Sequence, residues 1–350
     1  MEQRGSFQRR RDVVYFSHTE RAAAPAEWRN SMSQKVLVLG ATGAMGHYLT
    51  PKLADEGYQV DAVCLENVVS DRPNLRYIQV KDARDPAFVD EIVKNHYDAV
   101  VDLMIYNSVS FRQTFPKYTA NSGQYIYTSS CRVYANEDNP IVESSPRLLD
   151  VTTDRDLLFS DDYCMHKARG EDALRASKFK NWTIIRPSTT YSVKRCQLVT
   201  LERGKILQHI RSGEPVLLPE TARYIPASLT WGGDVAEMIK RLVFNPKAIC
   251  EDFNVTSSEK RTWEEIAGYY ADIFGLKHEW VEENEYQRFR DPTFDPEKSL
   301  GAVWQLKYAR LFNRAYDNSK MLDATGLKQE DFLTLYQGLS HEKETILADD

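Results

Sequence analysis

The 350-residue sequence has few cysteines, no long apolar run and no excess of basic charge. Its 5 cysteines are scattered and form no C-x-x-C pair, which argues against a zinc site and against a disulfide framework. Reduced thiols are typical of a cytoplasmic protein. Because no apolar run approaches the roughly 20 residues of a membrane span, no membrane helix is predicted. The formal net charge of −6 argues against broad, nonspecific binding of nucleic acid.

The first 33 residues are rich in arginine but lack the apolar core of a secretory signal. Acidic residues at positions 2, 12, 20 and 27 argue against a transit peptide. We therefore expect residues 1–33 to form a disordered extension, with the folded part beginning close to Met32.

A short apolar run at residues 35–39 (KVLVL) is typical of a buried parallel strand. Glycines follow at 40, 43 and 46, and then an amphipathic stretch that ends near Gly57. Strand, glycine turn and helix form the unit that binds dinucleotides, because glycine lets a pyrophosphate approach the backbone and a helix N-terminus favours anions. The residues expected to bind the cofactor here are Gly40, Thr42, Gly43, Ala44, Met45 and Gly46.

The alternation of strands and helices continues along the chain. Further strands are expected at 58–65, 75–80, 97–106, 123–130 and 181–187, with helical patterns between most of them. The sequence therefore predicts an α/β protein with a Rossmann-type, doubly wound parallel sheet. Ligands on such sheets bind at the carboxyl ends of the strands.

We place an NAD(P)-binding Rossmann domain at residues 34–187 and a smaller, mainly substrate-binding part at 188–340, interleaved with returning Rossmann elements. In the substrate part, Ser257 or Ser258 is expected to cap the helix that contains Trp263.

The spacing Tyr-x-x-x-Lys occurs at four places, beginning at Tyr48, Tyr77, Tyr163 and Tyr316. Only Tyr163 and Lys167 follow a strand that ends in hydroxyl residues, at positions 128–130. On a helix, residues four apart share one face. We interpret Tyr163 and Lys167 as a catalytic pair and the other three spacings as incidental.

Five segments together resemble, in order, the motifs of extended short-chain dehydrogenases/reductases of the NAD-dependent epimerase/dehydratase family. They are GATGAMG (40–46), VKDARD (80–85), YIYTSSCRVY (125–134), YCMHK (163–167) and TIIRPSTTYS (183–192). The resemblance extends from about residue 35 to about residue 332 and implies a homodimer formed through a four-helix interface. It also implies that Tyr163 is the acid/base, that Lys167 binds the nicotinamide ribose and favours the phenolate, and that Ser130 binds the reacting oxygen, with Ser129 as second candidate.

The resemblance implies hydride transfer between nicotinamide and a carbinol of a sugar-like, nucleotide-linked substrate. Glu66 lies roughly 20 residues past the glycine turn, where a ribose-binding acid is expected. No basic residue follows it until Arg72, so we favour NAD, while NADP stays open. Asp82, Leu103 and Pro187 are expected to contact the cofactor as well.

Two positions depart from the nucleotide-sugar pattern, because Ala227 occupies the slot of a phosphate-binding arginine and Trp231 that of a histidine. The expected fourth strand also ends in DLMIYN (102–107) rather than in the usual small, alanine-rich loop. Together these departures resemble a divergent branch that includes the chloroplast stem-loop-binding proteins, some of which bind RNA. The alternative function is therefore an RNA-binding or regulatory Rossmann scaffold that retains the cofactor site. Basic residues that could bind a phosphate instead are Lys194, Arg195, Arg223, Lys307, Arg310 and Arg314. The expected substrate contacts are Ser130, Tyr191, Lys194, Arg223 and Arg310.

Overall fold

A computed structural model describes residues 34–348 of the protein. The extension expected at 1–33 therefore lies outside the described residues. Within 34–348, no helix combines the length and the apolar character that crossing a membrane requires.

A seven-stranded sheet organises the fold, with the order β13-β6-β5-β4-β1-β2-β3. Every neighbouring pair of strands is parallel. The strands are β1 (Lys35–Leu39), β2 (Gln59–Cys64), β3 (Leu75–Gln79), β4 (Tyr97–Asp102), β5 (Ser122–Thr128), β6 (Trp182–Pro187) and β13 (Glu251–Val255). The order reverses between β1 and β4, so a crevice for ligands opens at their carboxyl ends. The predicted fold class is confirmed.

Two strands differ from the sequence-based expectation. β4 ends at Asp102 rather than at 106, because the Asp102 carboxylate accepts hydrogen bonds from the Met104 N–H and the Tyr106 hydroxyl and turns the chain. The edge strand β13 was not predicted individually. It comes from the half of the chain that follows residue 188 and pairs with β6.

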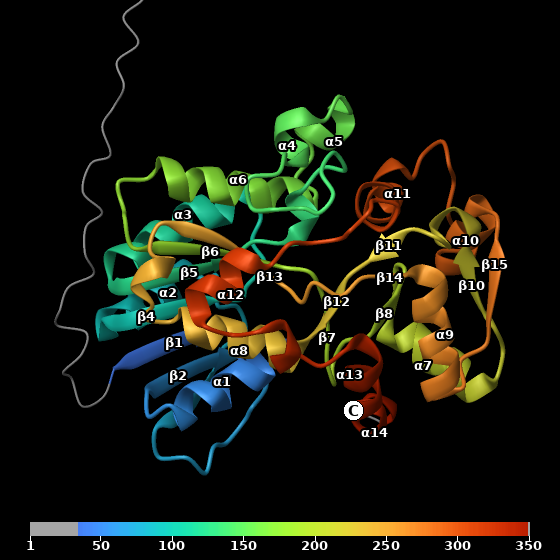
Figure 1. Cartoon of the computed structure of the whole chain (residues 1–350). Coiled ribbons are helices and arrows are strands. Elements are labelled where there is room, and N and C mark those ends of the chain that lie inside the picture. The colour runs from blue at the N-terminus through green and yellow to red at the C-terminus, as the bar shows by residue number, and fades with distance from the viewer. Residues whose placement is uncertain (1–33, 349–350) are drawn as a thin grey trace, which may run out of the picture. The chain divides into compact units, whose positions relative to one another are not determined.

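Helices cover both faces of the sheet (Figure 1). One face carries α2 (Pro86–Ile92), α3 (Ser108–Ala120) and α6 (Tyr163–Ala176), and the other carries α1 (Gly46–Asp55), α8 (Gly232–Leu242) and α12 (Ser319–Thr325). Each face buries its own apolar core against the sheet. Because α8 and α12 follow residue 188, the later half of the chain completes the Rossmann part.

The remaining elements form a separate apolar core beyond the strand ends. Four two-stranded sheets belong to this part: β7 (Thr189–Tyr191) with β12 (Leu229–Trp231), β8 (Gln197–Leu198) with β9 (Leu201–Glu202), β10 (Val216–Pro219) with β15 (His278–Val281), and β11 (Pro226–Ala227) with β14 (Arg261–Thr262). Its helices are α7 (Arg203–Ser212), α9 (Trp263–Phe274), α10 (Glu283–Arg290), α11 (Leu300–Gln305), α13 (Leu335–His341) and α14 (Lys343–Leu347). The short helices α4 (Leu148–Val151) and α5 (Arg155–Phe159) precede α6.

The expected cap of α9 is wrong. Thr262, not Ser257 or Ser258, accepts a hydrogen bond from the Glu265 N–H, and the Glu265 side chain accepts one from the Thr262 N–H. This reciprocal capping box satisfies two backbone donors at once.

Candidate active site

The glycine turn between β1 and α1 has the geometry of a phosphate cradle. Gly40 has a φ of +81°, which L side chains rarely adopt, and a Cβ on Gly46 would lie 2.3 Å from the Gly40 carbonyl oxygen. Among the described residues, no side chain caps α1 at Met45, and its first turn contains no acidic residue. The positive end of the helix dipole therefore stays available to an anion, so these residues fit a dinucleotide pyrophosphate.

Glu66 lies at the carboxyl end of β2, where a ribose would bind. The Thr42 hydroxyl donates a hydrogen bond to its carboxylate, which lowers the pKa of Glu66. Lys194 lies across from it, with Nζ 3.6 Å from Glu66 Oε1. Lys194 thus lies beside Glu66 and is not among the residues that line the cavity described below. A basic residue does stand beside Glu66, although the local sequence up to Arg72 offered none.

Of the other expected cofactor residues, Leu103 and Pro187 lie by the glycine turn and the neighbouring cavity. Leu103 packs against the turn, with its Cβ 3.5 Å from the position that a Gly40 Cβ would take. Asp82 is exposed and accepts hydrogen bonds from the side chain and backbone of Arg84, which lower the pKa of Asp82. Pro187 ends β6 and lines the cavity described next.

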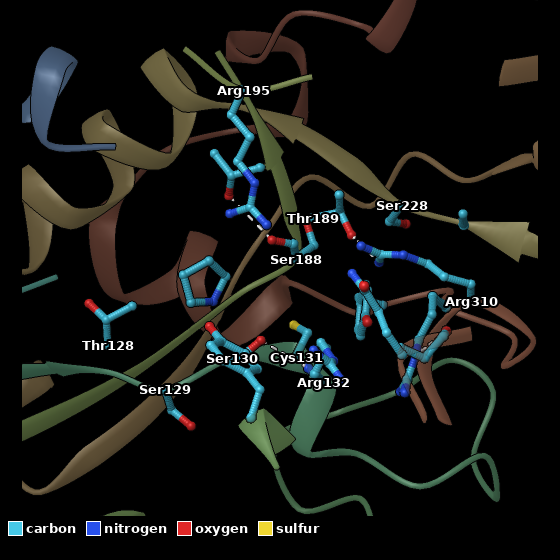
Figure 2. Close-up of a pocket in the computed structure, with 18 of the residues that line it drawn as sticks. Thr128, Ser129, Ser130, Cys131, Arg132, Ser188, Thr189, Arg195, Ser228 and Arg310 are labelled. Atoms are coloured by element: carbon cyan, nitrogen blue, oxygen red, sulfur yellow. Dashed lines mark hydrogen bonds between the residues drawn. The ribbon is translucent and has the colours of Figure 1, made fainter. Parts of the chain in front are cut away.

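A cavity of about 240 Å³ opens at the strand ends, between the sheet and the substrate part (Figure 2). Met45, Ser130, Tyr163, Pro187 and Arg310, five of the residues expected from the sequence, line it. The cavity therefore borders the glycine turn on one side and the hydroxyl-rich end of β5 on the other. Among residues 34–348, no cluster of His, Cys, Asp or Glu could bind a metal ion.

Tyr163 is the first residue of α6, and Lys167 follows one turn later. Lys167 is 1% exposed, and its Nζ donates hydrogen bonds to the carbonyl oxygens of Thr128 at 2.7 Å and Met104 at 3.1 Å. Its Nζ lies 5.8 Å from the centre of the Tyr163 ring. Burial lowers the pKa of Lys167, against the opposing effects of Tyr163 and Asp102. Lys167 thus connects α6 to the ends of β4 and β5.

The two candidate serines point in different directions. The Ser129 hydroxyl donates a 2.6 Å hydrogen bond to Glu171, behind the strand. Glu171 is completely buried and is bound by Arg186 through two contacts of 2.8 Å. In Figure 2 the Ser129 side chain points away from the neighbouring cavity residues. This geometry favours Ser130 as the residue that meets a substrate oxygen.

Three of the expected substrate contacts lie elsewhere. Tyr191 is buried in the core of the substrate part, against α13, where a Cβ on Gly338 would lie 1.9 Å from its hydroxyl. Arg223 is held outside the cavity by Glu264 and Glu220. With Lys194 beside Glu66, only Ser130 and Arg310 of the five line the cavity.

The cavity also contains residues that the motifs did not single out. Among them are Arg132, Ser188, Thr189, Ser228, Trp263, Gln305 and Tyr316. Arg195 and Arg314, two of the basic residues noted in the sequence, line it as well. Ser188 and Thr189 lie within the motif TIIRPSTTYS, which could have identified them. Tyr316 was expected to be incidental, yet it borders the cavity, while Lys320 pairs with Glu251 and Asp252.

Comparisons with known proteins agree with this architecture. The sequence pattern of the NAD dependent epimerase/dehydratase family matches residues 36–255. A curated relative, the chloroplast stem-loop binding protein of 41 kDa b from Arabidopsis thaliana, is 25% identical over 264 residues, which cover 70% of this chain and 65% of the relative.

Solved structures share the fold at low sequence identity. An epimerase from Methanothermobacter thermautotrophicus has a TM-score of 0.66 at 15% identity, covering 89% of this chain and 92% of that one. UDP-glucuronic acid 4-epimerase from Bacillus cereus, in complex with UDP-glucuronic acid and NAD, has a TM-score of 0.65 at 14% identity, covering 89% and 99%. A short-chain dehydrogenase/reductase superfamily protein from Agrobacterium tumefaciens with bound NAD has a TM-score of 0.61 at 16% identity, covering 89% and 97%.

Proposed function

The chain belongs to the NAD dependent epimerase/dehydratase family, and from that premise we propose that it is an NAD-dependent oxidoreductase or epimerase. Its substrate would be a sugar-like, nucleotide-linked molecule that reacts at a carbinol. The observation that carries the proposal is the convergence of Ser130 and Tyr163 on one cavity beside the glycine turn, with the Lys167 ammonium behind the Tyr163 ring.

Each residue of the proposed site would have a separate role in the reaction. Bound NAD supplies the hydride chemistry. Tyr163 takes the proton of the substrate hydroxyl or returns it, and the Ser130 hydroxyl holds the same oxygen in place. Lys167 would bind the nicotinamide ribose, and its Nζ lies 5.8 Å from the centre of the Tyr163 ring. In the described part of the chain, Glu66 and the glycine turn are the best candidates to bind ribose and pyrophosphate. NADP stays open as a cofactor.

Tyr163→Phe tests this assignment, because it removes the transferable proton and keeps the ring. Turnover should fall by a factor on the order of 10² or more, while the dissociation constant for NAD stays the same. Lys167→Met should weaken both turnover and NAD binding. Turnover of a panel of sugar nucleotides is followed by NMR of the product, and NAD affinity by calorimetry.

Tyr77→Phe is the matched control for the tyrosine variant. Tyr77 begins another Tyr-x-x-x-Lys spacing, but it lies on β3, away from the cavity. Tyr48 and Tyr316 are unsuitable, since the Tyr48 hydroxyl accepts a hydrogen bond from the Val193 N–H and Tyr316 lines the cavity. Full activity of Tyr163→Phe would refute the mechanism.

An RNA-binding or regulatory role is the second candidate. A relative of this chain is a chloroplast stem-loop binding protein, and Ala227 stands at the position where nucleotide-sugar enzymes have a phosphate-binding arginine. Electrophoretic mobility shifts with a structured RNA test it. Tight RNA binding without turnover of any sugar nucleotide would favour this role over the enzyme. The homodimer and the cytoplasmic location stay predictions.

A further inference from the structure

The described residues that line the cavity carry positive charge and no acidic side chain. Four arginines border it, and no aspartate or glutamate is among the described residues that line it. The arginines are Arg132, Arg195, Arg310 and Arg314. Figure 2 shows Arg132, Arg195 and Arg310 around the same space, each coming from a different segment of the chain. Like charges repel, and burial removes the hydration of Arg310 and Arg314, which are each 6% exposed, so a bound anion would stabilise this arrangement.

Arg310 illustrates this loss of hydration. It is 6% exposed, and its guanidinium donates hydrogen bonds only to neutral oxygens of described residues, namely those of Thr189, Gln197 and Val199. Burial, together with the charges of Arg132 and Arg195, lowers the pKa of Arg310 to about 9. Arg314 likewise donates to backbone carbonyls, those of Tyr134, Tyr308 and Ala309.

Arg132 differs from the others because it lies next to the reacting groups. It follows Ser130 by two residues, and its guanidinium carbon is 5.1 Å from the centre of the Tyr163 ring. Its side chain is 18% exposed, and within residues 34–348 its Nε is buried without a partner. Its Nη2 forms an ion pair with Asp162 at 3.4 Å, and the same Asp162 oxygen also accepts the hydrogen bond that caps α6.

We propose that Arg132 is a specificity residue that binds an anionic group on the reacting sugar itself. This inference rests on the proposed function and narrows its substrate class to acidic sugars, with a carboxylate close to the reacting carbinol. Arginine suits this task, because its planar donors match the two oxygens of a carboxylate. Arg195 and Arg310 would remain for the phosphate that links the sugar to its carrier.

The test compares two ligands that differ in one carboxylate, glucuronic acid 1-phosphate and glucose 1-phosphate. Their affinities for the full chain saturated with NAD are measured by calorimetry, so that neither turnover nor the nucleotide base enters the comparison. We expect the acidic sugar phosphate to bind at least about tenfold more tightly, the scale of a hydrogen bond between charged groups. Arg132→Met should abolish this preference, and Arg132→Lys should restore part of it.

Arg241→Met is the control for loss of an arginine, since Arg241 is exposed on α8 and pairs with Glu237. It should retain the full preference. Equal binding of the two sugar phosphates, binding of neither, or an undiminished preference in Arg132→Met would overturn the inference. NAD binding and the effect of Tyr163→Phe are read separately, so a failure here leaves the proposed function standing if both behave as expected.

Discussion

Replacing Glu171 by glutamine tests whether the buried charges behind the carboxyl end of β5 stabilise the folded protein. Glu171 is completely buried on α6, where it accepts hydrogen bonds from Ser129 and from Arg186, which is itself 1% exposed. Burial alone would raise the pKa of Glu171, but the charge and hydrogen bonds of Arg186 outweigh it and lower the pKa from 4.5 to about 2.

The expected loss of folding free energy in Glu171→Gln follows from the change in the pKa of Glu171 on folding. At about 1.4 kcal/mol for each tenfold change in acidity, a fall from 4.5 to about 2 corresponds to about 3 kcal/mol of folding free energy. Breaking a buried ion pair by removing one partner costs a similar roughly 3–5 kcal/mol. Because Arg186 keeps a second partner in Asp252 at 2.8 Å, the loss should lie near the lower figure, about 3 kcal/mol.

Urea unfolding at neutral pH measures the free energy of unfolding of Glu171→Gln. Asp172→Asn is the matched control on the same helix, because the Asp172 side chain is 49% exposed and Arg147, its partner, keeps Glu171 and Asp150 as other partners. The control should lose less than about 1 kcal/mol. A loss below about 1 kcal/mol for Glu171→Gln as well would refute the reasoning.

The dependence on pH gives a second check. Since folding lowers the pKa of Glu171, its contribution is present above pH 4.5 and is lost as the pH falls toward about 2. The stability difference between the wild type and Glu171→Gln should therefore be constant near neutrality and shrink across this acidic range. A difference that is independent of pH would contradict the assignment.

Two further predictions concern the cofactor. Gly43→Val should abolish NAD binding while the protein stays folded, since a Cβ there meets only the Gly40 carbonyl, at 3.3 Å. Gly46→Ala should also destabilise the protein, because its Cβ would lie 2.3 Å from the same carbonyl oxygen. Calorimetry measures NAD binding and thermal unfolding measures stability, and normal NAD binding by Gly43→Val would exclude the site. Glu66→Ala should raise the affinity for NADP, because Lys194 then faces the 2′-phosphate, and the double variant with Lys194→Met should lose this gain in affinity. A wild type that already binds NADP about tenfold more tightly than NAD would refute this assignment.

Local sequence patterns were sufficient for most of the sheet. The strands β1, β2, β5 and β6 contain short apolar runs that are largely buried, which makes them recognisable, whereas the edge strand β3 is only partly buried. The sequence predicts the end of β4 too late, because residues 103–106 are still apolar, whereas the Asp102 side chain turns the chain there. β13 was missed individually because its place beside β6 depends on a distant return of the chain.

Contiguous motifs likewise brought Met45, Ser130, Tyr163 and Pro187 to one cavity. Substrate contacts were harder to predict, since they depend on pairs of residues far apart in the sequence. Lys194 meets Glu66 only because the chain after β7 folds back over α1, where the Val193 N–H binds the Tyr48 hydroxyl. Arg223 has the same charge as Arg310, yet Glu264 holds it outside the cavity.

The buried ion pair behind Ser129 also bears on the mechanism. Well-packed apolar residues would often stabilise a core as much as such a pair, so stability alone does not explain why charges are buried there. We infer that Glu171 and Arg186 fix the end of β5, because Glu171 binds Ser129, next to Ser130, while Lys167 binds the carbonyl oxygen of Thr128. The folded fraction of Glu171→Gln should therefore bind NAD normally but turn over more slowly, with a lower kcat at an unchanged KM. Unchanged kcat in the folded variant would leave the pair with a purely structural role.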